Sequence, residues 1–185
     1  MRSVYLGLLI LLIFSCKNPF STRTPDGGGN NNGRWEFPGS PEIVIDNLKW
    51  AYEDRIISNY SSCFKSDFTF SPSDEDSSHF PIRFSNWDLT VELEATRLLF
   101  GIDTLTLILS PDMENHDIVS DTSALLYRDY ILIASQSSFC SSSEPCEGTS
   151  IFRLAKDESD SWSIEHWKDR GSANSWGLLK QEYRP

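Results

Sequence analysis

The sequence has few positive charges and no long apolar run. Its 185 residues contain 16 Lys and Arg against 27 Asp and Glu, which gives a formal net charge of −11. Such an acidic chain is a poor partner for nucleic acid and for anionic lipid head groups, because both repel it. The apolar segment Val4 to Phe14 has eleven residues, whereas a membrane-spanning helix needs about 20. We therefore expect no nucleic-acid partner and no retained transmembrane helix.

The common motifs for metal binding and nucleophilic catalysis are also missing. The three histidines, His79, His116 and His166, are far apart, and no His-x-x-x-His, paired-Cys motif or aspartate ladder occurs. Zinc and calcium sites in proteins are commonly built from such spacings. No Gly-x-Ser-x-Gly elbow for a serine nucleophile is present either. The sequence predicts no metal site and no cofactor.

The N-terminus has the pattern of a short secretion signal, with Arg2 before the apolar run and Ser15-Cys16 after it. Residues 13–16, Ile-Phe-Ser-Cys, resemble the lipobox of bacterial lipoproteins, in which cleavage precedes a cysteine that becomes lipid-modified. The resemblance implies that residues 1–15 are removed and that Cys16 carries a diacylglycerol and an acyl chain, such as palmitate. Two or more chains anchor a protein stably to a membrane. The alternative is an ordinary signal peptide that happens to precede a cysteine.

The same resemblance implies a place in the cell. Lys17, rather than Asp, follows the cysteine, so we expect a lipid-anchored protein of the cell envelope, attached to the outer membrane and facing the periplasm. Residues 16–40 include TPDGGGNNNG, a flexible composition with nothing apolar to bury. This segment reads as a tether with a root-mean-square span of about 25–30 Å. Residues 41–185 then form a single domain.

Three cysteines remain besides Cys16. Cys140 and Cys146 flank a short loop, and an oxidising compartment favours a local disulfide between such a pair. Cys63 lies on a helical pattern with no histidine near it in the sequence. We interpret Cys63 as a buried thiol rather than a nucleophile.

The first half of the domain has helical patterns. Ser40 and Pro41 begin a helix of about twenty residues, in which apolar residues recur every four positions from Val44 to Phe64, with a bend near Asp54. A short strand, a polar loop and a second helix follow, at residues 66–72, 72–81 and 84–101.

Beyond Gly101 the apolar period falls to two, which indicates β-strands. Four strands in succession predict an antiparallel meander, at residues 103–111, 123–135, 148–157 and 161–169. On the last strand, strict alternation places His166 with Trp162 and Ile164 on one face. It places Trp167 with Glu165 and Asp169 on the other.

This order of elements, with NLKWAYEDRIISNYSSCFKSDFTF at 47–70 and IFRLAKDESDSWSIEHWKDR at 151–170, resembles the nuclear transport factor 2-like superfamily. The resemblance implies an α+β cone, with N-terminal helices packed on a strongly curved antiparallel sheet. Members of the superfamily include ketosteroid isomerases, dehydratases and non-catalytic association domains, so the fold alone does not specify a reaction.

In a cone of this kind, four aromatic residues would line the rim of the interior as a ligand-binding set: Tyr52, Tyr60, Trp87 and Trp167. Asp88 or Asp169 would supply a carboxylate within it. The competing interpretation, which we favour, is that these aromatics are core and that Asp88 only caps a helix. We expect no catalytic residues.

The expected role is a non-catalytic module that binds a small apolar ligand or an envelope protein, with a homodimer through the sheet face as a further prediction. The alternatives are an isomerase- or dehydratase-like enzyme and a structural subunit of an envelope complex. A cone filled by side chains beside an exposed apolar sheet face would favour association.

Overall fold

The computed structural model describes residues 33–171 and 173–185. The predictions for the signal peptide and for Cys16 fall outside this part of the chain, as does most of the tether. Within it, no helix is long and apolar enough to cross a membrane.

The four long strands expected from the period-two pattern are present. They are β2 (Leu105–Pro111), β4 (Ser123–Ala134), β5 (Cys146–Lys156) and β6 (Trp162–Gly171). Each pairs antiparallel with the next, and the short β3 (Ile118–Val119) pairs with β4.

The remaining strand, β1 (Phe64–Ser71), completes the sheet order β1-β6-β5-β4-β2. It runs parallel to β6, so the sheet is mixed rather than wholly antiparallel. The period-two pattern could not reveal this pairing, because strand direction depends on how the intervening chain returns to the sheet edge.

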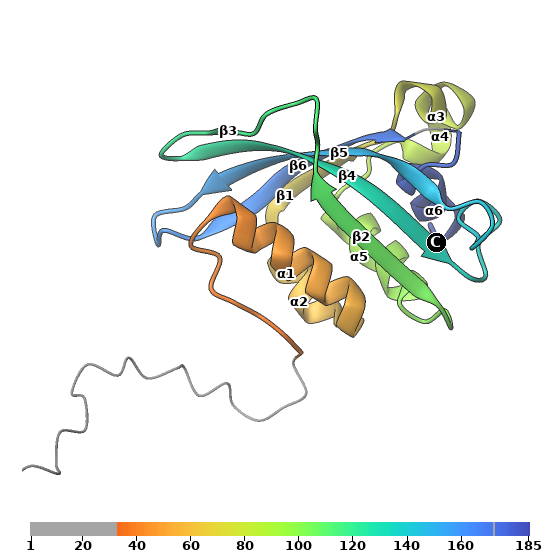
Figure 1. Cartoon of the computed structure of the whole chain (residues 1–185), viewed down its shortest axis with the longest axis horizontal. Helices are drawn as coiled ribbons and strands as arrows, with labels where there is room; N and C mark the ends of the chain where they lie inside the picture. The colour runs from red at the N-terminus through yellow and green to blue at the C-terminus, as the bar shows by residue number, and fades with distance from the viewer. Residues whose placement is uncertain (1–32, 172) are drawn as a thin grey trace, which may run out of the picture. The chain divides into compact units, whose positions relative to one another are not determined.

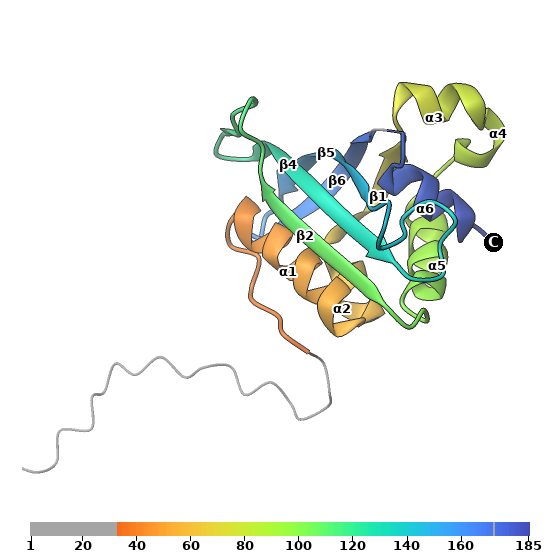
Figure 2. The same cartoon turned by 45° about the vertical axis from the view of Figure 1, so that its right-hand side comes forward.

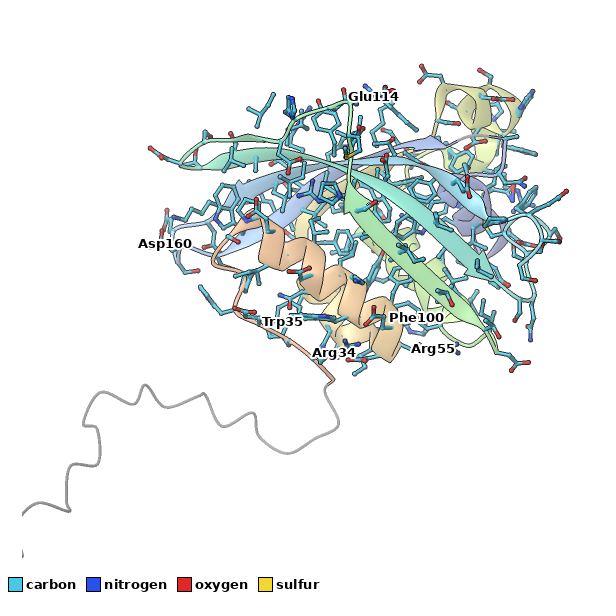
Figure 3. The ribbon with its side chains drawn as sticks, in the orientation of Figure 1. Arg34, Trp35, Arg55, Phe100, Glu114 and Asp160 are labelled. Atoms are coloured by element: carbon cyan, nitrogen blue, oxygen red, sulfur yellow. A yellow bond between two sulfur atoms is a disulfide. The ribbon has the colours of Figure 1, made fainter. Side chains whose placement is uncertain are left out.

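The predicted long helix is broken near its expected bend. Helix α1 (Pro41–Asp54) is capped by the Ser40 hydroxyl and ends at Arg55, which has a left-handed backbone with φ of 56°. Helix α2 (Ile57–Ser62) follows. The Arg55 guanidinium donates to the carbonyl oxygens of Ile102 and Asp103, and Figure 3 shows its side chain beside Phe100. These contacts fix the break against the turn that leads into β2.

The polar segment expected to be a loop, residues 72–81, instead contains a short helix, α3 (Asp74–His79), and a second short helix, α4 (Pro81–Phe84), begins at its last residue. The Ser73 hydroxyl caps α3, and Asp76 in its first turn is buried. Sequence periodicity missed these helices because each is too short to show an apolar stripe.

The second predicted helix is α5 (Leu89–Leu99), and Asp88 caps it by accepting a hydrogen bond from the Val91 N–H at 3.1 Å. The chain ends in a helix that the sequence did not predict, α6 (Trp176–Glu182), which Ser175 caps.

Helices α1, α2 and α5 cover one face of the sheet, and the core lies between them and the strands (Figures 1 and 2). Helix α6 packs against α5, β5 and β6 at the end of this layer. No helix in the described part of the chain covers the opposite face of the sheet, which we call the outer face. Glu114, in the loop after β2, lies on that outer side in Figure 3, and Arg34 and Trp35 lie beside α1.

The residues just before α1 are docked on the domain. Asn47 on α1 accepts a hydrogen bond from the Glu36 N–H and donates one to the Glu36 carbonyl. The carbonyl of Pro38 accepts from the Trp162 N–H at 2.8 Å. These contacts hold residues 36–38 against α1 and β6.

The structure supports the predicted disulfide. Cys140 and Cys146 are both fully buried and bonded, with 4.7 Å between their Cα atoms. Cys63 is a free thiol with no exposure, and burial raises its pKa. This environment disfavours the thiolate that a nucleophile would need.

We expect reduction of Cys140–Cys146 to lower the free energy of unfolding by about 2 kcal/mol, because closing so short a loop removes little entropy from the unfolded chain. Urea denaturation with and without a reductant measures this loss. Cys63→Ala gives the matched control, in which the reductant should have the same effect. Identical stability in both redox states of the wild type would contradict the prediction.

Candidate functional site

The inward face of β6 is set by a bulge. Arg153 on β5 pairs with His166, but the next residue, Leu154, pairs with Ile164, so Glu165 is an extra residue. The bulge reverses the alternation after Ile164. Trp167 and Asp169 therefore point to the core together with Trp162 and Ile164, whereas His166 lies on the outer face. The face assignment expected from strict alternation was wrong for these three residues.

The structure gathers the four predicted rim residues, Tyr52, Tyr60, Trp87 and Trp167, in the interior of the domain. All four are buried, the most exposed at 2%. The space between them is occupied by the chain itself, because Trp176 of α6 packs there at ring distances of 4.5 Å from Trp167 and 5.3 Å from Tyr52. Its indole N–H donates to the Tyr52 hydroxyl at 3.1 Å. Sequence reasoning missed this occupant because nothing in the tail indicates where it folds back.

Helix α6 also brings a lysine into the core. Lys180, 1% exposed, places its ammonium 2.8 Å from Oε1 of Glu92, which is fully buried on α5. This is an ion pair outside hydrogen-bond geometry. The ammonium also lies 3.2 Å from the ring centre of Trp167 and 4.1 Å from that of Phe70, so aromatic faces replace the water it has lost.

Glu92 has two further partners, both from the predicted set. The Tyr60 hydroxyl donates to its Oε1, and the Trp87 indole N–H donates to its Oε2 at 2.8 Å. A buried carboxylate is tolerated only when charge and hydrogen bonds replace its hydration. Glu92 and Lys180 are the interior residues that sequence analysis did not identify, since a Glu on a helix and a Lys near a C-terminus are usually solvated.

A second buried carboxylate, Asp169, holds the start of α6. Its Oδ1 accepts from the Tyr130 hydroxyl at 2.9 Å, and its Oδ2 accepts from the Gly177 N–H at 2.7 Å. Asp76 accepts from the Ser175 hydroxyl at 2.6 Å. Two carboxylates from distant parts of the chain thus bind the first turn of the same short helix.

Burial shifts the pKa values of the interior groups towards their neutral forms. It raises the pKa of Asp169 to about 6, although the hydrogen bonds from Gly177 and Tyr130 stabilise the charged carboxylate. It lowers the pKa of Lys180 to about 8, against the opposing effect of the Glu92 charge. Burial and the Glu92 charge also raise the pKa of Tyr52 and Tyr60.

The pKa of Asp169 predicts a pH dependence of stability. Its folded value of about 6 exceeds the ordinary 3.8, so the folded state holds this proton more tightly than the unfolded state. The contribution of Asp169 to the free energy of unfolding should therefore fall as pH rises from about 4 to about 6, by on the order of 2–3 kcal/mol, and be constant above. Urea denaturation of the wild type and of Asp169→Asn across this range isolates the effect. Parallel pH profiles would contradict it.

The outer face of the sheet has a different character. Apolar side chains there are partly exposed, among them Ile131 at 38% and Ile118 at 63%. A shallow hollow of about 220 Å³ lies over β4, β5 and β6, lined by Leu125, Tyr127, Ile151, Arg153, His166, Lys168 and Arg170. Asp129 also faces outward and accepts a hydrogen bond from the Thr149 hydroxyl.

The other two histidines, His79 and His116, are exposed in α3 and in the loop after β2. Among the residues that the structure describes, no group of three His, Cys, Asp or Glu side chains could hold a metal ion.

Solved structures share this architecture. A conserved protein from Planctomyces limnophilus matches with a TM-score of 0.54 and 8% identity, over 71% of this chain and 94% of its own. A protein of unknown function from Mycobacterium tuberculosis gives 0.53 and 9%, over 76% and 81%. An NTF2-like protein of unknown function from Pseudomonas putida gives 0.51 and 10%, over 69% and 81%. The domain has the nuclear transport factor 2-like fold.

The predicted α+β cone is thereby confirmed, and at these identities the likeness concerns the fold alone. No protein-family model and no curated protein matches the chain. In this domain Trp176 and Lys180 of α6 fill the interior beside Tyr52 and Trp167.

Proposed function

We propose that the domain is a non-catalytic association module of the cell envelope, held to the membrane by lipid on Cys16 and contacting its partner through the outer face of the sheet. The observation that carries the proposal is the filled cone. Trp176 is fully buried among Tyr52, Tyr130 and Trp167, and the hollow over the outer face is open at the surface. An unpartnered sheet face with exposed isoleucines is the kind of surface that proteins use to associate.

Site-specific photocrosslinking tests the surface. A photoreactive residue at Ile131 or Tyr127 should give a discrete adduct in intact cells, and the same residue at Glu75, exposed on α3, should not. Sedimentation of the purified protein separates the two partner types, since a second copy of the chain gives a dimer and an envelope protein does not. The absence of adducts from both outer-face positions would overturn the proposal.

The lipid anchor has its own test. Cys16→Ser should abolish labelling by a fatty-acid analogue and release the protein from the membrane fraction, because no other residue supplies the anchor in this proposal. A variant that stays labelled and membrane-bound would show that residues 13–16 are not a lipobox.

The rival function is an isomerase- or dehydratase-like enzyme that uses the cone interior. The observation in its favour is Asp169, a buried carboxylate with a raised pKa that accepts a hydrogen bond from Tyr130. Such groups are typical of active sites. Against it stands α6, which binds Asp169 through Gly177 and fills the adjoining space. Native mass spectrometry of the purified protein decides between them, because a small molecule retained with α6 displaced would favour the enzyme.

A further inference from the structure

The outer face carries a row of basic side chains. His166, Lys168 and Arg170 lie at alternate positions of β6, and Arg153 on β5 is the direct cross-strand partner of His166. Alternate residues of a strand point to the same side. Because the bulge at Glu165 turns His166 outward, these four side chains form one continuous patch, which we call the basic row.

The basic row is poorly neutralised by the chain's own acids. Lys168 pairs with Asp74 at 3.0 Å, but the Asp74 side chain is 95% exposed, and such pairs contribute little. Within the described chain, neither Arg153 nor Arg170 forms an ion pair. The charge of Arg170 also lowers the pKa of the Asp112 carboxyl, but the hydrogen bonds that this carboxyl accepts from Asn115 and Glu114 lower it more.

The neighbouring cations act on His166. Its pKa is lowered by burial and then by the positive charges of Arg153 and Lys168. Arg153, Lys168 and Arg170 therefore form a positive surface inside a chain of net charge −11, and a bound anion would reduce the repulsion among these charges.

Apolar side chains lie directly beside the row. In the hollow of about 220 Å³, Leu125 and Tyr127 from β4 and Ile151 from β5 adjoin the four basic residues. A second hollow of about 270 Å³ shares Arg153 and His166 and adds Thr69, Asp67 and Glu165. The Thr69 hydroxyl and the His166 Nδ1 are 2.9 Å apart there. The two hollows adjoin at Arg153 and His166, and together we call them the groove.

We propose that the basic row binds an extended acidic segment of a partner protein, whose main chain lies over the hollow beside Leu125, Tyr127 and Ile151. The spacing supports this ligand. Same-face residues of β6 are about 6.6 Å apart, and an extended peptide presents alternate side chains at the same interval. Three carboxylates at every second position of the peptide can therefore contact the row in order: the first at Arg153 and His166, the second at Lys168 and the third at Arg170.

The surroundings of the row select a narrow ligand. Asp67, Asp74 and Glu165 border it, and the chain as a whole is strongly acidic. A broad polyanion such as a lipid surface or nucleic acid would meet these carboxylates as well as the cations. A single extended strand can contact the row without crossing its acidic border.

This inference rests on the proposed association through the outer face and names the chemistry of the partner. The probe is a synthetic peptide of about ten residues with alternating glutamate and serine, titrated against the full-length protein at low and moderate salt. The site variant is Arg153→Gln with Arg170→Gln. The matched control is Arg83→Gln with Arg97→Gln, which removes the same charge from exposed positions on α4 and α5. Arg153→Lys with Arg170→Lys keeps the charge.

We expect saturable binding that weakens with salt, falls about tenfold in the site variant and is retained in the control and in the lysine variant. A peptide with the same glutamates in one block should bind several times more weakly. Absence of binding, or an equal loss in the control, would overturn the inference. The inference would also be overturned if anionic phospholipid vesicles or inorganic phosphate alone bound with the same dependence on Arg153 and Arg170. The same holds if the protein were a dimer that the site variant converted to monomers.

The crosslinking test keeps the two proposals apart. Adducts at Ile131 or Tyr127 without peptide binding would leave the association surface in place and remove only the acidic partner. Peptide binding without adducts in cells would mean that the groove recognises acidic segments but that the domain does not associate through this face in the envelope.

Discussion

Replacing Trp176 with alanine is expected to lower the free energy of unfolding by about 3–5 kcal/mol. The side chain is fully buried and contacts the rings of Tyr52, Tyr130 and Trp167. Its removal takes away the transfer energy of a large aromatic group and leaves a cavity at the centre of the cone. It also removes the hydrogen bond that the Trp176 indole N–H donates to the Tyr52 hydroxyl.

Urea denaturation followed by far-UV circular dichroism measures this loss. Trp35→Ala is the matched control, because Trp35 is 39% exposed and lies outside the cone, and it should change stability by less than about 1 kcal/mol. A loss as small for Trp176→Ala would mean that α6 is not an integral part of the core, and the argument from a filled cone would fail.

The second large effect is expected for Glu92→Gln. This change removes the counter-charge of the buried Lys180 ammonium, and an uncompensated buried charge costs about 3–5 kcal/mol. The amide also cannot accept from both Tyr60 and Trp87 as the carboxylate does. Part of the loss should be relieved as pH rises, because the Glu92 charge holds the pKa of Lys180 up to about 8, and without that charge the buried ammonium loses its proton at a lower pH.

A double-mutant cycle with Lys180→Met isolates the pair. Glu92→Gln with Lys180→Met should cost clearly less than the sum of the single changes, since the double variant buries no charge. The surface pair Lys49 and Glu53, 4.0 Å apart on α1, is the control, and its cycle should give a coupling below about 0.5 kcal/mol. Additive losses at Glu92 and Lys180 would show that water reaches the interior pair.

Both results bear on function as well as stability. Losses of several kcal/mol on altering Trp176 or Glu92 would show that both side chains belong to the core, which would support the proposed association over the rival enzyme. The proposed association surface is the outer face, where the basic row adjoins partly exposed apolar residues.

The sequence indicates one part of the candidate site, the interior aromatics, but not the other part, the basic row. The aromatics Tyr52, Tyr60, Trp87 and Trp167 were identified as an interior set from the resemblance to a cone fold, and they do lie together, although strict alternation had placed Trp167 on the face opposite Trp162. The basic row was not identified, because strict alternation placed His166 on the same face as Trp162. One inserted residue, Glu165, reverses the faces of everything after it.

The sequence by itself determined helices α1 and α5, strand β1 and the four long strands, the caps at Ser40 and Asp88, the break near Asp54 and the Cys140–Cys146 pair. Each of these depends on side chains a few residues apart, whose preferences persist in any fold. Only the tertiary structure decided the parallel pairing of β1, the bulge in β6 and the insertion of α6. These depend on contacts between distant segments, such as Trp176 with Tyr52, 124 residues apart along the chain. Local periodicity carries no information about which distant group will fill a space, so the closed interior and the exposed basic row appear only when the chain is folded.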